Sequence, residues 1–226
     1  PPTPAWPGVT PDPAMRIPAG ITAATSVDGM SVYSANVLIE PQYMRATTAI
    51  SVENASPVLQ DVIGIGGNGE YSYGLRVSAD VKNTHHITVT RGRYKANSSG
   101  WDRWQSQVVV GLTRTTGTFT DVVIYAGGGP DYSTGFSCND CGATTISGGS
   151  IDGGSAQASP IGMSLSGDVA GFAATNTTIF SGTGGLYDKV YGVKFDNCVG
   201  APILTNVTIT AADTVIQGSL GVFSRG

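Results

Sequence analysis

The chain has 226 residues, a formal net charge of −4, and only 12% charged residues. That share is about half the usual one, while glycine, with 32 residues, is about twice as frequent as usual. Strong helix formers are scarce, which argues against a helical bundle, a coiled coil or a doubly wound α/β enzyme. There is no basic stripe for a nucleic acid partner, and no apolar run approaches the roughly 20 residues that membrane insertion requires.

The two ends of the chain differ in composition from its middle. Residues 1–20 contain seven of the twelve prolines, which favours a Pro-rich linker or N-terminal cap. We expect at least one strand in residues 21–48, over 32–40, and a β-helix that occupies 21–210. Residues 211–226 are predicted to be a C-terminal capping segment, because the last coil of such a fold exposes unpaired strand edges.

A short pattern recurs through most of the chain. Each unit begins with a small or polar residue, alternates apolar, polar and apolar positions, and continues through a turn into a second alternating strand. Six units start at Ala49, Gly74, Gln107, Gly135, Gly162 and Gly192, with spacings of 25, 33, 28, 27 and 30 residues. Such a drifting period is typical of a solenoid.

Each unit is too short to bury its own apolar face, whereas stacked units share a continuous core. Two or three short strands per coil, with Gly, Asn and Asp at the corners, therefore predict a β-solenoid. An antiparallel sandwich or barrel also has many short strands and glycine-rich turns. The similar residue types at the aligned starts favour the solenoid.

The alternating strands and the Asn-x-Thr-Ile endings at 176–179 and 206–209 resemble the right-handed parallel β-helix family. This pectin-lyase-like fold is shared by polysaccharide lyases, phage tailspikes and related surface fibres. The resemblance covers roughly residues 49–210 and concerns the fold, since no catalytic motif of the family accompanies it. It implies an all-β, right-handed parallel β-helix of about six or seven coils, assembled as a homotrimer.

Aromatic residues precede several of the units at the same offset. Tyr71, Trp104 and Tyr132 each lie three residues before a unit start. Equivalent positions of successive coils stack about 4.8 Å apart, so that these rings would form a ridge able to bind sugar rings. The remaining predicted ligand-binding residues are Tyr73, Trp101 and Arg103. The alternative is that the aromatic residues pack against neighbouring loops or lie in a subunit interface.

Catalysis by glycoside hydrolysis would need two carboxylates, roughly 5 Å apart for retention or 6.5–9.5 Å apart for inversion. The candidate residues are Asp102, Asp131 and Asp188. The adjacent aspartate pair of polygalacturonase-like members of the family does not occur in this sequence. Solvated carboxylates at the coil corners are the alternative interpretation, and it favours binding over catalysis.

Other polar and sulfur-containing residues have structural interpretations. We expect Glu53-Asn54, Asn139-Asp140 and Asp196-Asn197 to form polar ladders at one corner of the coils. Cys138 and Cys141 are expected to be small buried thiols, because the three cysteines cannot complete a zinc site. His85 and His86 are adjacent in a strand and would point to opposite faces, so we predict no metal site.

The sequence thus predicts a non-catalytic adhesin, or the receptor-binding tip of a fibre, that recognises a cell-surface glycan or polysaccharide. One alternative is a tailspike-type polysaccharide depolymerase, either a hydrolase or a lyase. Another is a purely structural, trimerising fibre segment. No cofactor is implied, and the expected location is extracellular, on a cell surface or a virion fibre.

Overall fold

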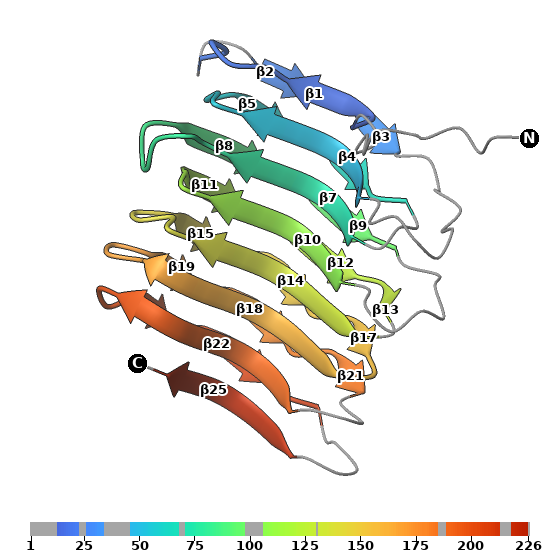
Figure 1. Ribbon diagram of the computed structural model, residues 1–226, viewed down its shortest axis with the longest axis vertical. Coiled ribbons are helices and arrows are strands. Elements are labelled where there is room, and N and C mark those ends of the chain that lie inside the picture. The colour runs from blue at the N-terminus through green and yellow to red at the C-terminus, as the bar shows by residue number, and fades with distance from the viewer. Residues whose placement is uncertain are drawn as a thin grey trace, which may run out of the picture.

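The computed structural model describes residues 13–22, 26–33, 46–67, 71–97, 106–129, 131–184, 189–212 and 218–225. All regular secondary structure in these ranges is β-strand, and the strands stack into a parallel β-solenoid of about six turns (Figure 1). Every strand pair in the described residues is parallel, and strands that are neighbours in a sheet belong to successive coils. The predicted solenoid is therefore confirmed, and the antiparallel sandwich is excluded.

Three long sheets form the walls of the solenoid, and we call them sheets A, B and C. Sheet A contains, in spatial order, β1 (Met15–Ile17), β4 (Ala46–Glu53), β7 (Tyr71–Ser78), β10 (Ser106–Thr113), β14 (Tyr132–Asn139), β18 (Ser159–Asp168), β22 (Val190–Val199) and β25 (Ser219–Arg225). Sheet B contains β2 (Ser26–Asp28), β5 (Val58–Gln60), β8 (His86–Thr90), β11 (Thr116–Thr120), β15 (Thr145–Ser147), β19 (Ala173–Thr175) and β23 (Ile203–Thr205).

Sheet C runs in the same direction with one strand per coil. Its strands are β3 (Ser31–Tyr33), β6 (Ile63–Ile65), β9 (Arg93–Ala96), β12 (Val123–Ala126), β16 (Ser150–Asp152), β20 (Thr178–Phe180) and β24 (Thr208–Thr210). A short fourth sheet, formed by β13 (Gly128–Gly129), β17 (Ser155–Ala156) and β21 (Thr183–Gly184), follows sheet C in three coils. Each coil thus has three main strands, the upper end of the expected range.

The core lies between the three sheets and consists of side chains stacked in register. The inward position of sheet A is occupied by Ile50, Leu75, Val110, Phe136, Met163 and Val193 in successive coils, all with no exposed surface. Phe136 packs edge-to-face against Phe119 of sheet B, with ring centroids 5.4 Å apart. Because every coil adds one apolar layer to the next, the stack buries a core that no single coil could form.

The turn between sheets B and C begins with a residue of positive φ in every coil. These first turn residues are Gly29, Asp61, Arg91, Asp121, Gly148, Asn176 and Asn206, and Gly149 adds a second positive φ in one coil. Glycine, asparagine and aspartate tolerate this left-handed region better than other residues, which explains most of the series. Arg91 is the exception, and its guanidinium group makes hydrogen bonds of 2.8 and 2.6 Å to the carboxylate of Asp61 in the preceding coil.

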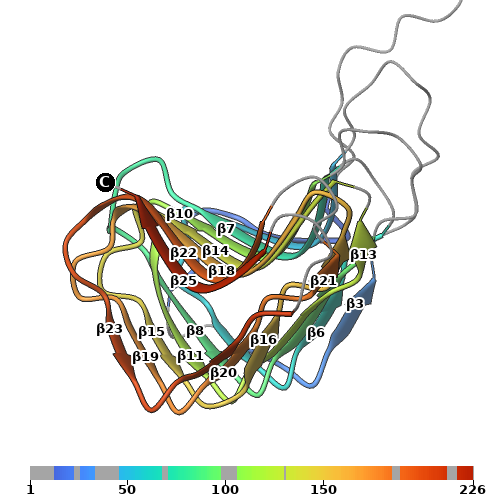
Figure 2. The same cartoon turned by 90° about the horizontal axis from the view of Figure 1, so that it is seen from below.

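Sheet A bends in the middle, with its concave side facing away from sheets B and C (Figure 2). The bend coincides with the predicted unit starts, where small residues allow the backbones of sheets A and C to approach each other. A Cβ atom on Gly162, for example, would lie 2.6 Å from the carbonyl oxygen of Gly192 and 2.7 Å from Cγ2 of Ile179. At Gly162 the absence of a side chain is therefore a requirement of close backbone packing.

One predicted unit start is wrong by two residues. Val110 pairs with Leu75 and with Phe136, which places Val109, and not Gln107, at the level of Gly74 and Gly135. Gln107 instead lies two residues before Val109 in the strand and is fully buried. Its side-chain amide donates a 2.6 Å hydrogen bond to the carbonyl oxygen of Gly128. The sequence alignment of the units relied on a small residue at each start, and this coil has a valine there.

Both ends of the chain contribute strands to sheet A. β1 lies within the predicted N-terminal linker or cap and pairs with β4, while β25 lies within the predicted capping segment and pairs with β22. Of the strand expected over 32–40, residues up to Tyr33 belong to β3, and the remainder lies outside the described residues.

Candidate functional site: the concave face of sheet A

Two files of outward-pointing side chains line the concave side of sheet A, and we call them together the concave face. The first file is Thr48, Tyr73, Val108, Thr134, Ile161, Tyr191 and Leu220. The second file is Ser51, Arg76, Gly111, Ser137, Ser164, Lys194 and Phe223. In each strand, two successive residues at the bend both point into the core. The residues before and after them, such as Thr48 and Ser51, therefore point to the same outer side of the sheet.

The first file is enclosed, although it points away from the core. Thr134, Ile161 and Tyr191 are each only 8% exposed, whereas an outward side chain on a flat sheet keeps much of its surface in contact with solvent. The curvature seen in Figure 2 accounts for this, because side chains on the concave side of a bend converge. The concave face is therefore a partly sheltered, apolar strip with polar edges, as ligand sites usually are.

A cation and an aromatic ring form a pair near each end of the concave face. The guanidinium carbon of Arg76 lies 5.8 Å from the ring centroid of Tyr73, and Nζ of Lys194 lies 5.7 Å from that of Tyr191. The pairs are separated by four coil steps, or roughly 19 Å at about 4.8 Å per step. Both distances are within the range of cation–π attraction, which restrains the rings.

The ring of Tyr73 also occupies space that a missing side chain leaves open. A Cβ atom on Gly111, one coil further along, would lie 3.4 Å from the ring atom Cε1 of Tyr73. Burial raises the pKa of the Tyr73 hydroxyl, an effect that the nearby Arg76 partly offsets. The phenol is therefore protonated at neutral pH and can act as a hydrogen-bond donor.

Between the two cation–aromatic pairs, the concave face is uncharged. Its central coils present Val108, Thr134 and Ile161 in the first file and the hydroxyls of Ser137 and Ser164 in the second. This combination of apolar surface with hydroxyl groups suits a ligand that itself alternates C–H faces and hydroxyls. The described side chains of the concave face include no nucleophile–base pair.

The predicted aromatic ridge is only partly within the described residues. Tyr71 and Tyr132 do lie at the same level of sheet A, but Ser106 lies between them, so that the two tyrosines are two coils apart. Tyr132 is 46% exposed and Tyr71 is half-buried. Trp104 was assigned to the ridge because it lies three residues before the unit start predicted at Gln107, and that unit start is wrong. Trp104 lies outside the described residues, as do Trp101 and Arg103.

Only one of the three candidate catalytic carboxylates lies in the described part of the chain. Asp131 directly precedes β14, and its backbone carbonyl accepts hydrogen bonds from the amides of Ala158 and Ser159, both at 3.0 Å. Asp102 and Asp188 lie outside the described residues. The prediction that these three residues could support hydrolysis therefore stays a prediction.

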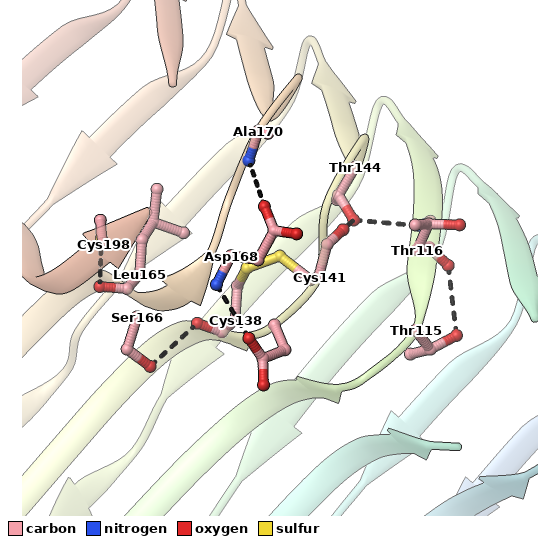
Figure 3. The surroundings of a disulfide bond; sticks show 12 residues. Thr115, Thr116, Cys138, Cys141, Thr144, Leu165, Ser166, Asp168, Ala170 and Cys198 are labelled. Atoms are coloured by element: carbon pink, nitrogen blue, oxygen red, sulfur yellow. Dashed lines mark hydrogen bonds between the residues drawn. A yellow bond between two sulfur atoms is a disulfide. The ribbon is translucent and has the colours of Figure 1, made fainter. Parts of the chain in front are cut away.

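Cys138 and Cys141 are fully buried as expected, but they form a disulfide bond in place of two thiols (Figure 3). Their Cα atoms are 5.6 Å apart, across the corner between sheets A and B. Cys198 carries a free thiol that donates a 3.2 Å hydrogen bond to the carbonyl oxygen of Leu165, and burial raises its pKa. The prediction of two thiols is therefore wrong, and the buried position of the disulfide at the corner explains a structural role.

The predicted polar corners have the expected turn geometry. Asn54, Asp140 and Asn197 all have positive φ values, and Oδ1 of Asp140 accepts a 2.8 Å hydrogen bond from the amide of Asp168 in the next coil. Lys82 reaches across this corner, with its Nζ 3.2 Å from Oδ1 of Asp140 and 3.0 Å from Oδ2 of Asp168. These side chains connect successive coils.

The two histidines have no metal-binding partners. Nδ1 of His86 is 2.8 Å from the hydroxyl of Thr116 and Nε2 is 3.0 Å from that of Thr118, so that both ring nitrogens are used within sheet B. Burial lowers the pKa of His86. Among the described residues, no group of three His, Cys, Asp or Glu side chains could hold a metal ion. The same residues contain no helix with the length and apolar character needed to cross a membrane.

Sequence reasoning identified Tyr73 but missed the rest of the concave face. Val108, Ile161 and Tyr191 belong to strands whose alternation was recognised, yet nothing in the pattern shows that the outer side of the bend is sheltered.

The comparisons with known proteins do not add a functional assignment: no family model, curated protein or solved structure matches this chain.

Proposed function

We propose that the chain is the β-solenoid of an extracellular adhesin or receptor-binding fibre and that its concave face binds a cell-surface glycan. The observation that carries the proposal is the enclosed outward file, in which Thr134, Ile161 and Tyr191 are sheltered without belonging to the core. The strip is apolar along its length and is bordered by the half-buried ring of Tyr73 and the partly exposed hydroxyls of Ser137 and Ser164. A sugar chain lying along the solenoid axis would pack there.

The chemistry of the strip supports a carbohydrate over a peptide or a lipid. A pyranose ring places its C–H face on the half-buried ring of Tyr73, and its hydroxyls exchange hydrogen bonds with Ser137 and Ser164. Tyr191, whose ring packs against Phe223 with centroids 5.2 Å apart, closes the other end of the strip. One coil step of about 4.8 Å is close to the length of one sugar ring, so that successive sugars would meet equivalent positions. The proposal extends to a right-handed, pectin-lyase-like helix and to a homotrimer of the tailspike kind.

The test is binding of the full chain to bacterial surface polysaccharides on a glycan array and to intact cells in a sedimentation assay. We expect Tyr73→Ala and Tyr191→Ala each to weaken binding about tenfold, which corresponds to ~1.4 kcal/mol. Thr120→Ala, on the outer side of sheet B, is the matched control and should bind as the parent chain does. Trp101→Ala and Trp104→Ala test the predicted contribution of the segment that precedes β10.

Three outcomes separate the alternatives. Release of reducing ends or unsaturated uronates from a bound polysaccharide would identify a depolymerase in place of an adhesin. Unchanged binding in Tyr73→Ala and Tyr191→Ala would show that the concave face is not the site. Absence of any glycan binding, together with a stable trimer in light scattering, would favour the structural fibre segment.

A further inference from the structure

The outer side of sheet C carries a second file of side chains that the proposed function does not use. Its seven members occupy equivalent positions of successive coils: Tyr33, Ile65, Lys95, Tyr125, Asp152, Phe180 and Thr210. We call this set the sheet C file. Sheet C and the concave side of sheet A face different directions around the solenoid, so that no single ligand on one face contacts the other (Figure 2).

Large aromatic side chains in the sheet C file remain exposed. Tyr33 is 63% exposed and Tyr125 is 45% exposed, and Val123, the outward neighbour of Tyr125 in β12, is 41% exposed. Tyr33, Tyr125 and Tyr132 are the exposed aromatic residues among those that the structure describes. Two of these three therefore lie in one file on one sheet, where folding of the chain does not account for them.

Charged groups flank Tyr125 on both sides of the file. Nζ of Lys95, in the preceding coil, lies 5.6 Å from the ring centroid of Tyr125 and restrains the ring by a cation–π contact. Asp152, in the following coil, accepts a 2.8 Å hydrogen bond at Oδ1 from the amide of Gly154, which fixes the carboxylate. Neither group forms an ion pair with a described residue, so that ammonium hydrogens and carboxylate lone pairs are left for a ligand.

The order of the groups matches the chemistry of an extended polysaccharide. Along the axis the file reads cation, aromatic, carboxylate and aromatic at Lys95, Tyr125, Asp152 and Phe180. The two aromatic residues are two coil steps apart, or roughly 9.6 Å. In an unbranched chain of equatorially linked pyranoses, successive rings are turned over, so that the same face recurs at every second sugar.

We infer that the sheet C file is a second carbohydrate-binding surface, separate from the concave face, for a neutral, equatorially linked polysaccharide lying along the solenoid axis. Every second sugar places its C–H face on Tyr125 or Phe180. Hydroxyls of the sugar between them donate to Asp152, and a hydroxyl next to Tyr125 accepts from Lys95. A chain with two such faces can connect two polysaccharide strands or bind one surface with higher avidity.

The probes are cellohexaose and chitohexaose, which are unbranched and equatorially linked, and binding to the full chain is measured by calorimetry. We expect Tyr125→Ala to weaken binding about tenfold, or ~1.4 kcal/mol, and Phe180→Ala and Asp152→Asn to weaken it severalfold. Thr178→Ala is the matched control, because it lies in the same strand as Phe180 but outside the file, and it should leave binding unchanged. Thermal unfolding of each variant verifies that it folds.

The two surfaces are tested separately by combining variants. The double variant Tyr73→Ala with Tyr191→Ala should keep its affinity for the hexasaccharides even though it loses the binding assigned to the concave face. Retained cell-surface binding without affinity for either hexasaccharide would overturn this inference and leave the proposed function intact. If Tyr125→Ala leaves sugar binding unchanged and instead dissociates an oligomer, the sheet C file is a subunit interface and the inference is wrong.

Discussion

Two outward-facing isoleucines, one on sheet A and one on sheet B, differ in how much of their side chain is exposed to solvent. Ile161 on sheet A is 8% exposed, and Ile203 on sheet B is 58% exposed, although both occupy outward positions of parallel strands. Part of the difference comes from position, because β23 is the last strand of sheet B and has a neighbour on one side only. Sheet A is bent and its outer side is concave, whereas the outer side of sheet B is open and carries mostly threonine and serine. The same alternation thus produces a sheltered strip on one wall and an ordinary solvated surface on the other.

The bend of sheet A, in addition to the alternation of residues, thus creates a candidate binding face in this fold. The curvature itself depends on the small residues at the bend, where sheet A contacts sheet C. Substitutions that act on the bend, on the outward file and on the corner between sheets A and B therefore test the comparison, in decreasing order of expected effect.

The largest effect is expected from Gly162→Val at the bend. The new side chain would overlap the carbonyl oxygens of Gly192 and Phe180, 2.6 and 2.8 Å from its Cβ, and the side chain of Ile179. We expect the free energy of unfolding to fall by about 3 kcal/mol or more, measured by urea denaturation. Gly221→Val is the control, since Gly221 occupies the same position of the last coil with no atom within 4 Å of a Cβ. Equal losses in both variants would show that the bend is not set by close packing.

A smaller effect is expected from shortening the two isoleucines themselves. Ile161→Ala removes methyl groups from the sheltered strip and should lower the free energy of unfolding by about 2 kcal/mol. Ile203→Ala removes the same atoms from an exposed position and should change it by less than about 0.5 kcal/mol. The comparison uses the same denaturation assay. A loss for Ile203→Ala as large as that for Ile161→Ala would contradict the contrast between the two walls.

The smallest effect concerns Lys82, which holds the corner between sheets A and B. The pKa of Asp140 is lowered by the backbone amide of Asp168 and by Lys82, and that of Asp168 by the amide of Ala170 and by Lys82. Carboxyl groups with a lowered folded-state pKa contribute stability above their unfolded value of 3.8, and this contribution is lost as the pH falls through the folded value. The same contacts raise the pKa of Lys82, so that its charge persists throughout this range.

Lys82→Met should therefore melt at a lower temperature than the parent chain at pH 7, and the difference should disappear as the pH approaches 2. Thermal unfolding followed by circular dichroism between pH 2 and pH 7 measures it, and 1 M salt should reduce it because the pair is exposed to solvent. Arg93→Met, on the exposed side of sheet C, controls for the loss of a positive charge. A difference that persists at low pH would assign the effect to packing of the Lys82 side chain and not to its ion pairs.

Much of the fold followed from the sequence because a solenoid repeats its local rules. Five of the six unit starts were placed correctly, since a glycine or an alanine marks the bend in those five coils. The sixth failed at Val109, where a buried valine replaces the glycine and three successive valines allow more than one register. A better marker was present at the turn between sheets B and C, where residues with positive φ recur in every coil.

The candidate sites were harder to predict than the fold. The sequence identified Tyr73 and aligned Tyr71 with Tyr132, but it placed Trp104 in the coil between the last two, where the structure has Ser106. It also gave no sign that Lys95, Tyr125 and Asp152 would be neighbours, because residues about 30 positions apart become adjacent only when the length of every loop is known. The disulfide between Cys138 and Cys141 likewise depends on the corner that brings their Cα atoms together.

Local chemistry is sufficient for this chain to form short strands, to turn at glycine, asparagine and aspartate, and to stack similar coils, because alternation and turn propensity act within a few residues. Which outward side chains are sheltered depends on the assembled solenoid, since the bend of sheet A arises from contact with sheet C. The assembled solenoid also decides which residues share a file, because the register between coils is the sum of all the intervening loops. The concave face and the sheet C file are both products of those long-range contacts.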